Sequence, residues 1–139
     1  MDLAVEEDPK PEDVRLLEEQ INAFNEASTG ITDGKLLGVF LRETDGSTLG
    51  GLFGWTWGGT CYIRYLFVPT HLRRRGYGSR LMSMVESEAR ARGCHQIALE
   101  THDFQAPAFY HRLGFSVTGR IDAYPLGHGQ LTMVKPLNA

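Results

Sequence analysis

The 139 residues, of which 42% are hydrophobic and 22% charged, have the composition of one globular domain with a core of its own. A net charge of −3 gives no support for bulk nucleic-acid binding, and no apolar run approaches the roughly 20 residues of a membrane span. The acidic first ten residues do not have the pattern of a signal peptide. We therefore expect a single domain over residues 1–139 in the cytoplasm, with no nucleic-acid or membrane partner and with Cys61 and Cys94 as reduced thiols.

A helix is expected near the start of the chain. Residues 1–8 predict a short edge strand, and the helix follows from Pro11 to about Glu26. Proline suits a first helical turn, where its missing N–H is not needed, and Gly30 is a stop signal just after the end. Apolar residues recur at helical spacing and form one hydrophobic stripe of Val14, Leu17, Ile21 and Phe24.

Short glycine turns then separate three β-prone runs, at residues 36–43, 48–57 and 60–68. Such short connections predict an antiparallel meander, and Pro69 ends it because proline cannot donate to a β-ladder. Trp55 and Trp57 share one face of the second strand, either in the core or as an aromatic wall of a binding site. In the third strand we expect Cys61, Ile63, Tyr65 and Phe67 on one face, and Tyr62, Arg64, Leu66 and Val68 on the other.

The turn after the third strand carries the clearest chemical signal in the chain. It consists of Arg73, Arg74, Arg75, Gly76, Tyr77, Gly78 and Ser79. Glycines let a tight turn bring backbone N–H groups close to a ligand, and the helix that begins here adds partial positive charge. Arginines pair well with phosphate oxygens, so the turn predicts a phosphate cradle. Its spacing matches neither the Walker loop nor the dinucleotide-binding fingerprint.

The second half of the chain predicts a parallel crossover and two final strands. The helix after the glycines should run to about Arg92, and a strand–helix–strand unit of this length normally makes a right-handed parallel connection. We therefore predict an α+β fold, in which a mixed sheet has an antiparallel first half, one parallel step and flanking helices. The expected elements are a strand at 95–101, a short helix at 106–113 and strands at 115–121 and 130–136.

Two segments of the chain resemble the GNAT superfamily of N-acetyltransferases. Arg73-x-x-Gly76-x-Gly78 is similar to the acetyl-CoA signature of that family. The second family motif is matched at Ala106, Tyr110, Gly114 and Phe115. The resemblance covers roughly residues 22–137, and it is closest to a small bacterial subgroup with an FQAPxFY segment and a late YPxGH loop. Asp103 stands where the family usually has an Asn that contacts the cofactor.

The resemblance implies a GNAT-like sheet with acetyl-CoA as the donor. In the family, the strand before the signature parts from its parallel neighbour and the pantetheine arm lies in the gap. Backbone N–H groups of residues 74–79 would hold the pyrophosphate, and the N–H of Phe67 or Val68 would stabilise negative charge on the thioester oxygen. Tyr110 matches the tyrosine that protonates the departing thiolate. The predicted cofactor-binding residues are Leu66, Phe67, Val68, Arg73, Arg74, Arg75, Gly76, Tyr77, Gly78, Ser79, Asp103, Phe109 and Tyr110.

The group that takes the proton of the amine is left open by the motifs. Glu100, His102 and Asp103 cluster at the carboxyl end of a parallel strand, where open α/β sheets bind ligands, and any of them could accept this proton. Glu100 and Asp103 join Tyr110 as the predicted catalytic residues, although each acid could equally cap or solvate the loop.

The remaining histidines and the late loop give weaker signals. His128 and Tyr124 could line the acceptor pocket or only shape a turn around Pro125. His111 is expected on the surface, one helical step away from Tyr110. The histidines and acids do not have the spacing of a ligand set, so no metal is predicted.

The function predicted from these residues is acetyl transfer from acetyl-CoA to a primary amine, with a small molecule favoured as acceptor. One alternative keeps the chemistry but makes the acceptor a protein Lys or N-terminus. Another alternative is a CoA-binding module without catalysis. The least favoured alternative is an RNA binder that uses the basic turn. Folds of this kind commonly form homodimers through a late strand, which the resemblance leaves open here.

Overall fold

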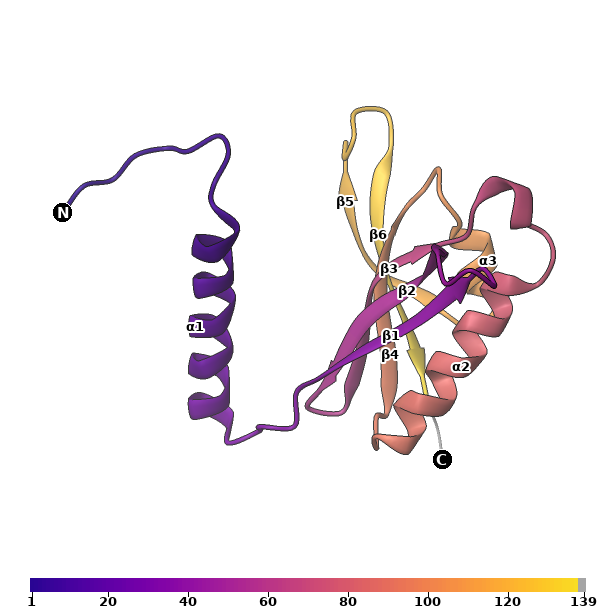
Figure 1. Ribbon diagram of the computed structural model, residues 1–139, viewed down its shortest axis with the longest axis horizontal. Coiled ribbons are helices and arrows are strands. Elements are labelled where there is room, and N and C mark those ends of the chain that lie inside the picture. The colour runs from indigo at the N-terminus through magenta and orange to yellow at the C-terminus, as the bar shows by residue number, and fades with distance from the viewer. Residues whose placement is uncertain (138–139) are drawn as a thin grey trace. The chain divides into compact units, whose positions relative to one another are not determined.

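The computed structural model describes residues 1–137 and separates them into two compact units, residues 1–32 and the residues from Asp33 onwards (Figure 1). That the whole chain forms one domain stays a prediction. Among the described residues, no helix is both long enough and apolar enough to cross a membrane.

The helix of the first unit is α1 (Pro11–Thr29), which extends about one turn beyond the predicted end. Gly30 follows it in the left-handed conformation, with φ of 73°, and its N–H donates to the carbonyl of Glu26 at 2.8 Å. Glycine is favoured there because it has no Cβ to strain this conformation. The prediction of an edge strand at residues 1–8 is wrong: the segment is not a strand, and acidic residues such as Glu6 and Glu7 have low β-propensity.

The second unit is built on a mixed sheet of six strands in the order β1-β2-β3-β4-β6-β5. The strands are β1 (Lys35–Arg42), β2 (Thr48–Trp57), β3 (Thr60–Phe67), β4 (Gln96–His102), β5 (Ser116–Asp122) and β6 (Gly129–Pro136). Between them lie a short 3₁₀ helix η1 (Thr70–Leu72) and the helices α2 (Tyr77–Ala91) and α3 (Pro107–Arg112).

The strand pairing confirms the predicted α+β architecture. β1, β2 and β3 form the antiparallel meander, and β3 and β4 are the parallel pair on either side of α2. β6 lies between β4 and β5 and is antiparallel to both. α2 packs against β1, β2 and β3, so the first half of the sheet presents one face to this helix.

A β-bulge reverses the alternation of side chains in β3. The register with β2 shifts at Arg64, which opposes no residue of β2. Ile63 is buried as predicted, but Tyr65 and Phe67 are 60% and 54% exposed, and Leu66 packs against the core in their place. The predicted alternation is therefore wrong beyond Ile63, because one extra residue moves every following side chain to the opposite face.

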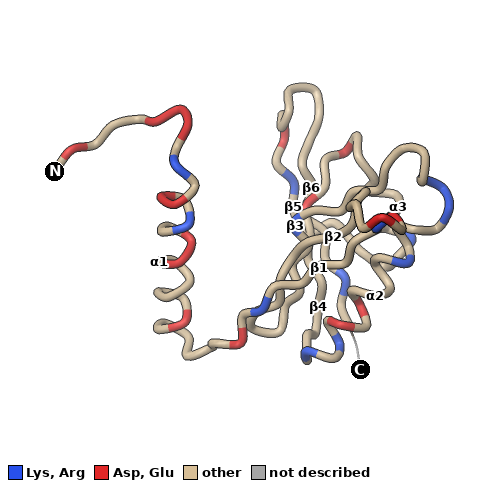
Figure 2. Tube along the Cα trace, in the orientation of Figure 1, with Lys and Arg blue, Asp and Glu red and all other residues tan. Residues whose placement is uncertain are grey.

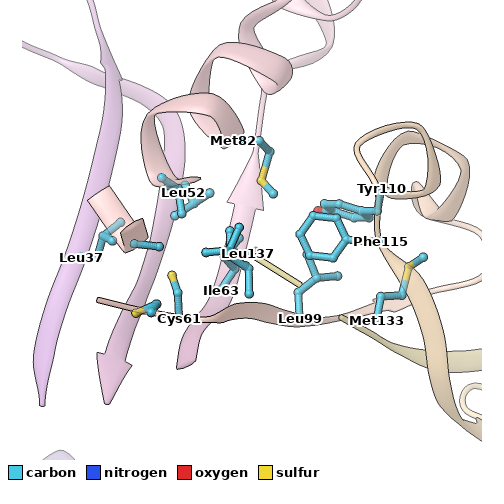
Figure 3. Packing of buried hydrophobic residues seen from close by; sticks show 14 of the residues in the cluster. Leu37, Leu52, Cys61, Ile63, Met82, Leu99, Tyr110, Phe115, Met133 and Leu137 are labelled. Atoms are coloured by element: carbon cyan, nitrogen blue, oxygen red, sulfur yellow. The ribbon is translucent and has the colours of Figure 1, made fainter. Parts of the chain in front are cut away.

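The core of the second unit is continuous from the meander to the last strands. Val85 and Ala89 of α2 and Met133 of β6 are completely buried. Figure 3 shows Tyr110 and Phe115 beside one another, close to Met133, with their ring centroids 5.7 Å apart. The helix that carries Tyr110 is thus held to the sheet by the same core that holds α2.

Two methionines offer a matched test of this packing. Met133 is 0% exposed and Met84 is 56% exposed. Met133→Ala should lower the free energy of unfolding by about 2–5 kcal/mol, because the lost side chain leaves a cavity. Met84→Ala should change it by less than about 0.5 kcal/mol, as expected of a surface position. Urea unfolding of both variants measures the difference, and equal losses would show that this part of the core is not packed as described.

Candidate active site

The parallel strands β3 and β4 pair only over their first halves. Four residue pairs join them, from Thr60 with Gln96 to Ile63 with Leu99. Beyond that point β3 continues along β2 alone and β4 along β6 alone. The edge of β3 that includes Leu66 and Phe67 therefore has no strand bonded to it on the β4 side. The bulge at Arg64 lies where the strands part, and bulges bend and twist a strand.

The loop after β3 brings a helix N-terminus to the end of this gap. Gly76 precedes α2 with a φ of 82°, and the first N–H that bonds within the helix is that of Arg80, to the carbonyl of Gly76 at 3.0 Å. The N–H groups of Tyr77, Gly78 and Ser79 have no acceptor inside the helix, as at any helix N-terminus. A Cβ at Gly76 would meet no atom within 4 Å, so this glycine itself is not crowded by other residues. This geometry fits a phosphate group.

The glycine at position 78 has a packing role as well. A Cβ there would lie 3.2 Å from the ring of Phe109, which is tighter than ordinary contact. α2 and α3 can therefore approach each other closely at Gly78. In this way the predicted cofactor residues Gly78 and Phe109 come together, although they are far apart in the sequence.

The three arginines of the turn differ in what they contact. Figure 2 shows them as a blue run on the loop that leads into α2. Arg73 donates from Nε to the carbonyl of Val68 at 2.8 Å and places its guanidinium 5.8 Å from the ring centre of Phe67, so it braces the loop. Arg74 and Arg75 are exposed, and Arg74 has a positive φ of 60°, which is uncommon for a residue with a Cβ. Within the described part of the chain, neither Arg74 nor Arg75 makes a hydrogen bond like the one that joins Arg73 to the carbonyl of Val68.

Tyr110 is a buried phenol on a short helix. Its side chain is 8% exposed and lies edge-on to Phe109 and Phe115, with ring centroids 5.2 and 5.7 Å away. Burial raises the pKa of Tyr110 to about 12, since the phenolate would lose its hydration. The phenol therefore stays protonated at every physiological pH and can act as a proton or hydrogen-bond donor.

Asp103 is held by three donors at the end of β4. Its carboxylate accepts hydrogen bonds from Nδ1 of His128 and from the N–H of Gly129, both at 2.9 Å, and Arg120 lies 3.5 Å away. Partial burial would raise the pKa of Asp103, but the hydrogen bonds of His128 and Gly129 and the charges of His128 and Arg120 outweigh it and lower this pKa. A carboxylate stabilised in this way is a weak base.

Glu100 and Trp55 are linked through Tyr62. The hydroxyl of Tyr62 donates to Oε1 of Glu100 at 3.1 Å, and its ring lies 5.1 Å from that of Trp55. Burial, with the charge of Glu100, raises the pKa of Tyr62. Trp55 is 36% exposed, so of its two predicted positions the core is excluded. It belongs to an aromatic row on the sheet face away from the core.

A cluster of rings surrounds the end of β4. His102 stacks on Phe104 with centroids 5.3 Å apart, and Phe104 meets His128 edge-on at 4.9 Å. Nδ1 of His102 lies 3.0 Å from the carbonyl of Tyr124. His128 and Tyr124 shape the late loop, since their N–H groups donate to the carbonyls of Pro125 and His128, and their rings also lie beside Phe104 and His102; that they line an acceptor pocket stays a prediction. Phe104 and Arg120 were not among the predicted residues, and a sequence without pairing information has no signal that places them here.

The predicted residues thus fall into connected groups. The contact of Phe109 with Gly78 joins α3, which carries Tyr110, to the first turn of α2. Glu100 and Asp103 lie on or beside β4, across the gap. His111 is exposed, as expected. Among the described residues, His, Cys, Asp and Glu nowhere form a group of three that could hold a metal ion.

Comparison with known proteins agrees with this interpretation. The model of the Acetyltransferase (GNAT) family matches residues 1–115. An acetyltransferase of Agrobacterium fabrum is 36% identical over 116 residues, which cover 84% of this chain and 83% of that protein. Blasticidin-S acetyltransferase of Streptomyces morookaense is 40% identical over 96 residues, covering 66% and 68%. A crystal structure from Agrobacterium tumefaciens has a TM-score of 0.90 and 31% identity, with 99% of this chain and 100% of that one covered. The chain therefore belongs to the GNAT acetyltransferase family, whose members use acetyl-CoA as the donor.

Proposed function

We propose that this enzyme transfers the acetyl group of acetyl-CoA to a primary amine of a small molecule, by direct attack of the amine. The main observation in support of this proposal is that β3 separates from β4 after four residue pairs, with the N-terminus of α2 following β3. The similarity to blasticidin-S acetyltransferase supports a small-molecule acceptor. The two free thiols Cys61 and Cys94 are in keeping with a cytoplasmic location, which we also propose.

The residues present fit the donor along its length. The unpaired backbone of Leu66 and Phe67 can bond an extended amide-containing arm as a strand would. The N–H groups at the start of α2, with Arg74 and Arg75 beside them, offer donors and positive charge to a pyrophosphate. Acetyl-CoA supplies a thioester carbonyl for the amine to attack and a thiol as the leaving group.

Different groups of the protein are assigned to the sulfur, the carbonyl oxygen and the amine. We assign Tyr110 to the sulfur as proton donor, because its phenol stays neutral and lies on α3, which packs on Gly78 through Phe109. An N–H of Phe67 or Val68 is assigned to the carbonyl oxygen, where negative charge develops. Glu100, His102 and Asp103 are the candidates for accepting the proton of the amine, and most of the acceleration is expected from positioning the reactants.

An acceptor screen tests this function. Purified protein is incubated with acetyl-CoA and, separately, with blasticidin S, spermidine and a lysine-containing peptide, and release of CoA thiol is followed. Acetylation of blasticidin S or spermidine, confirmed by mass spectrometry, is the expected result. Faster acetylation of the peptide would instead assign a protein acceptor. Tight binding of acetyl-CoA without transfer to any amine would leave a CoA-binding module without catalysis.

A further inference from the structure

His102 occupies the place on β4 that faces the reactive end of the gap. The last parallel pair is Ile63 with Leu99, and the register is constant over all four pairs. β4 continues three residues beyond Leu99 to His102, and because the bulge at Arg64 adds one residue to β3, the β3 residue level with His102 across the gap is Phe67. Leu99 and Thr101 are buried, and because side chains alternate along a strand, His102 points to the other face of the sheet. This face also carries Glu100.

The ring of His102 is fixed in orientation and in tautomer. Its Nδ1 lies 3.0 Å from the carbonyl oxygen of Tyr124. A carbonyl only accepts hydrogen bonds, so Nδ1 must carry the hydrogen and the neutral ring has its lone pair on Nε2. Phe104 stacks on one side of the ring at an interplanar angle of 12°, and Tyr124 meets it edge-on at 85°. A base held in this way needs no reorganisation before it accepts a proton.

The neighbouring titratable groups are less suited to the same task. Asp103 already accepts from His128 and Gly129 and pairs with Arg120. Glu100 accepts from the hydroxyl of Tyr62 and lies nearer to the paired part of the strands. Of the titratable groups, Tyr124 contacts the His102 ring directly, His128 contacts its neighbour Phe104, and Glu100 and Asp103 lie beside His102 in the chain. Asp103 and His128 hold Phe104 and the late loop in place around it.

We propose that His102 is the catalytic base of the reaction, a role that rests on the proposed function. An ammonium acceptor first loses one proton to solvent. As the new C–N bond forms, Nε2 of His102 takes a second N–H proton, the C–S bond breaks, and the sulfur receives the proton of Tyr110. The imidazolium then releases its proton to water and the phenolate recovers one, so that the enzyme is restored. Asp103 and His128 act as positioning residues.

The test compares His102→Gln with the wild type and with His111→Gln. Glutamine keeps a polar side chain of similar size but cannot take up a proton, and His111 is an exposed histidine outside the site. With blasticidin S or spermidine as acceptor, His102→Gln should lower kcat/KM by about 10²-fold or more. His111→Gln should leave kcat/KM unchanged, and calorimetry should show that both variants bind acetyl-CoA as the wild type does.

A second measurement does not depend on activity. Long-range ¹H–¹⁵N spectra of the wild type should show the Nδ1–H tautomer of His102 at neutral pH. The Nε2–H tautomer, or a kcat/KM of His102→Gln equal to that of the wild type, would overturn the role of His102 while the proposed function stands. A wild type that binds acetyl-CoA and acetylates no amine would overturn the proposed function and this role together.

Discussion

Replacing Tyr110 with Phe should lower kcat by about 10²–10⁴-fold, the usual contribution of a positioned acid, or about 3–5 kcal/mol of transition-state stabilisation. The ring of Tyr110 packs among Phe109 and Phe115, and Phe keeps those contacts, so the fold should be retained. Binding of acetyl-CoA, measured by calorimetry, should therefore be unchanged. Because burial raises the pKa of Tyr110 to about 12, its ionisation should cause no loss of activity at neutral or mildly alkaline pH.

Tyr65→Phe is the control for this experiment. Tyr65 is 60% exposed on β3, and its ring lies beneath the guanidinium of Arg64 at 4.8 Å. Loss of its hydroxyl should leave kcat within about twofold of the wild type, since surface changes of this kind cost little. A full rate in Tyr110→Phe would show that the departing sulfur takes its proton from another source, and equal losses in both variants would show that the loss is not specific to the hydroxyl of Tyr110.

Gly76→Trp should abolish the binding of acetyl-CoA. Gly76 is the residue that precedes α2, and a Cβ there would meet no atom within 4 Å, so a tryptophan has room beside the helix N-terminus where the pyrophosphate is expected. The positive φ of 82° also strains any residue with a Cβ, at a cost of about 1–3 kcal/mol. Calorimetric titration with acetyl-CoA, CoA and ATP measures the result. The wild type should bind acetyl-CoA and CoA in the micromolar range and should not bind ATP.

Gly93→Trp separates the blocked site from the strained backbone. Gly93 follows the other end of α2 and has a φ of 78°, and a Cβ added there would likewise meet no atom within 4 Å. Both substitutions should therefore cost similar stability in urea unfolding, but only Gly76→Trp should lose the ligand. Micromolar binding by Gly76→Trp would place the pyrophosphate elsewhere, and loss of binding in both variants would show that strain alone is responsible.

Local patterns in the sequence predict most elements of the second unit to within one or two residues. Glycine turns and Pro69 mark the ends of the first three strands, and Gly93 follows α2 with the positive φ that glycine permits. The ion pairs Glu86–Arg90 and Glu88–Arg92 form at 3.2 and 3.0 Å, as their spacing of four residues predicts. These features depend on neighbours in the chain, and so the sequence is sufficient to predict them.

Other features depend on residues that are distant in sequence. The bulge at Arg64 arises from the pairing of β3 with β2, and it overrides the period-two pattern on which the predicted faces of Tyr65 and Phe67 rest. The environment of Asp103 is made by His128, Gly129 and Arg120, which the pairing of β4, β5 and β6 brings beside it. Residue types alone made Glu100, His102 and Asp103 equivalent candidates, and only their partners distinguish them.

The sequence by itself therefore determined the order of the elements, the family signature and the identity of the chemical groups, because these are local properties of the chain. Tertiary structure decided where β3 leaves β4, how deeply Tyr110 is buried and which nitrogen of His102 is free. Each of these follows from strand register and packing between distant segments, and they convert a family resemblance into a site with assigned donors and acceptors.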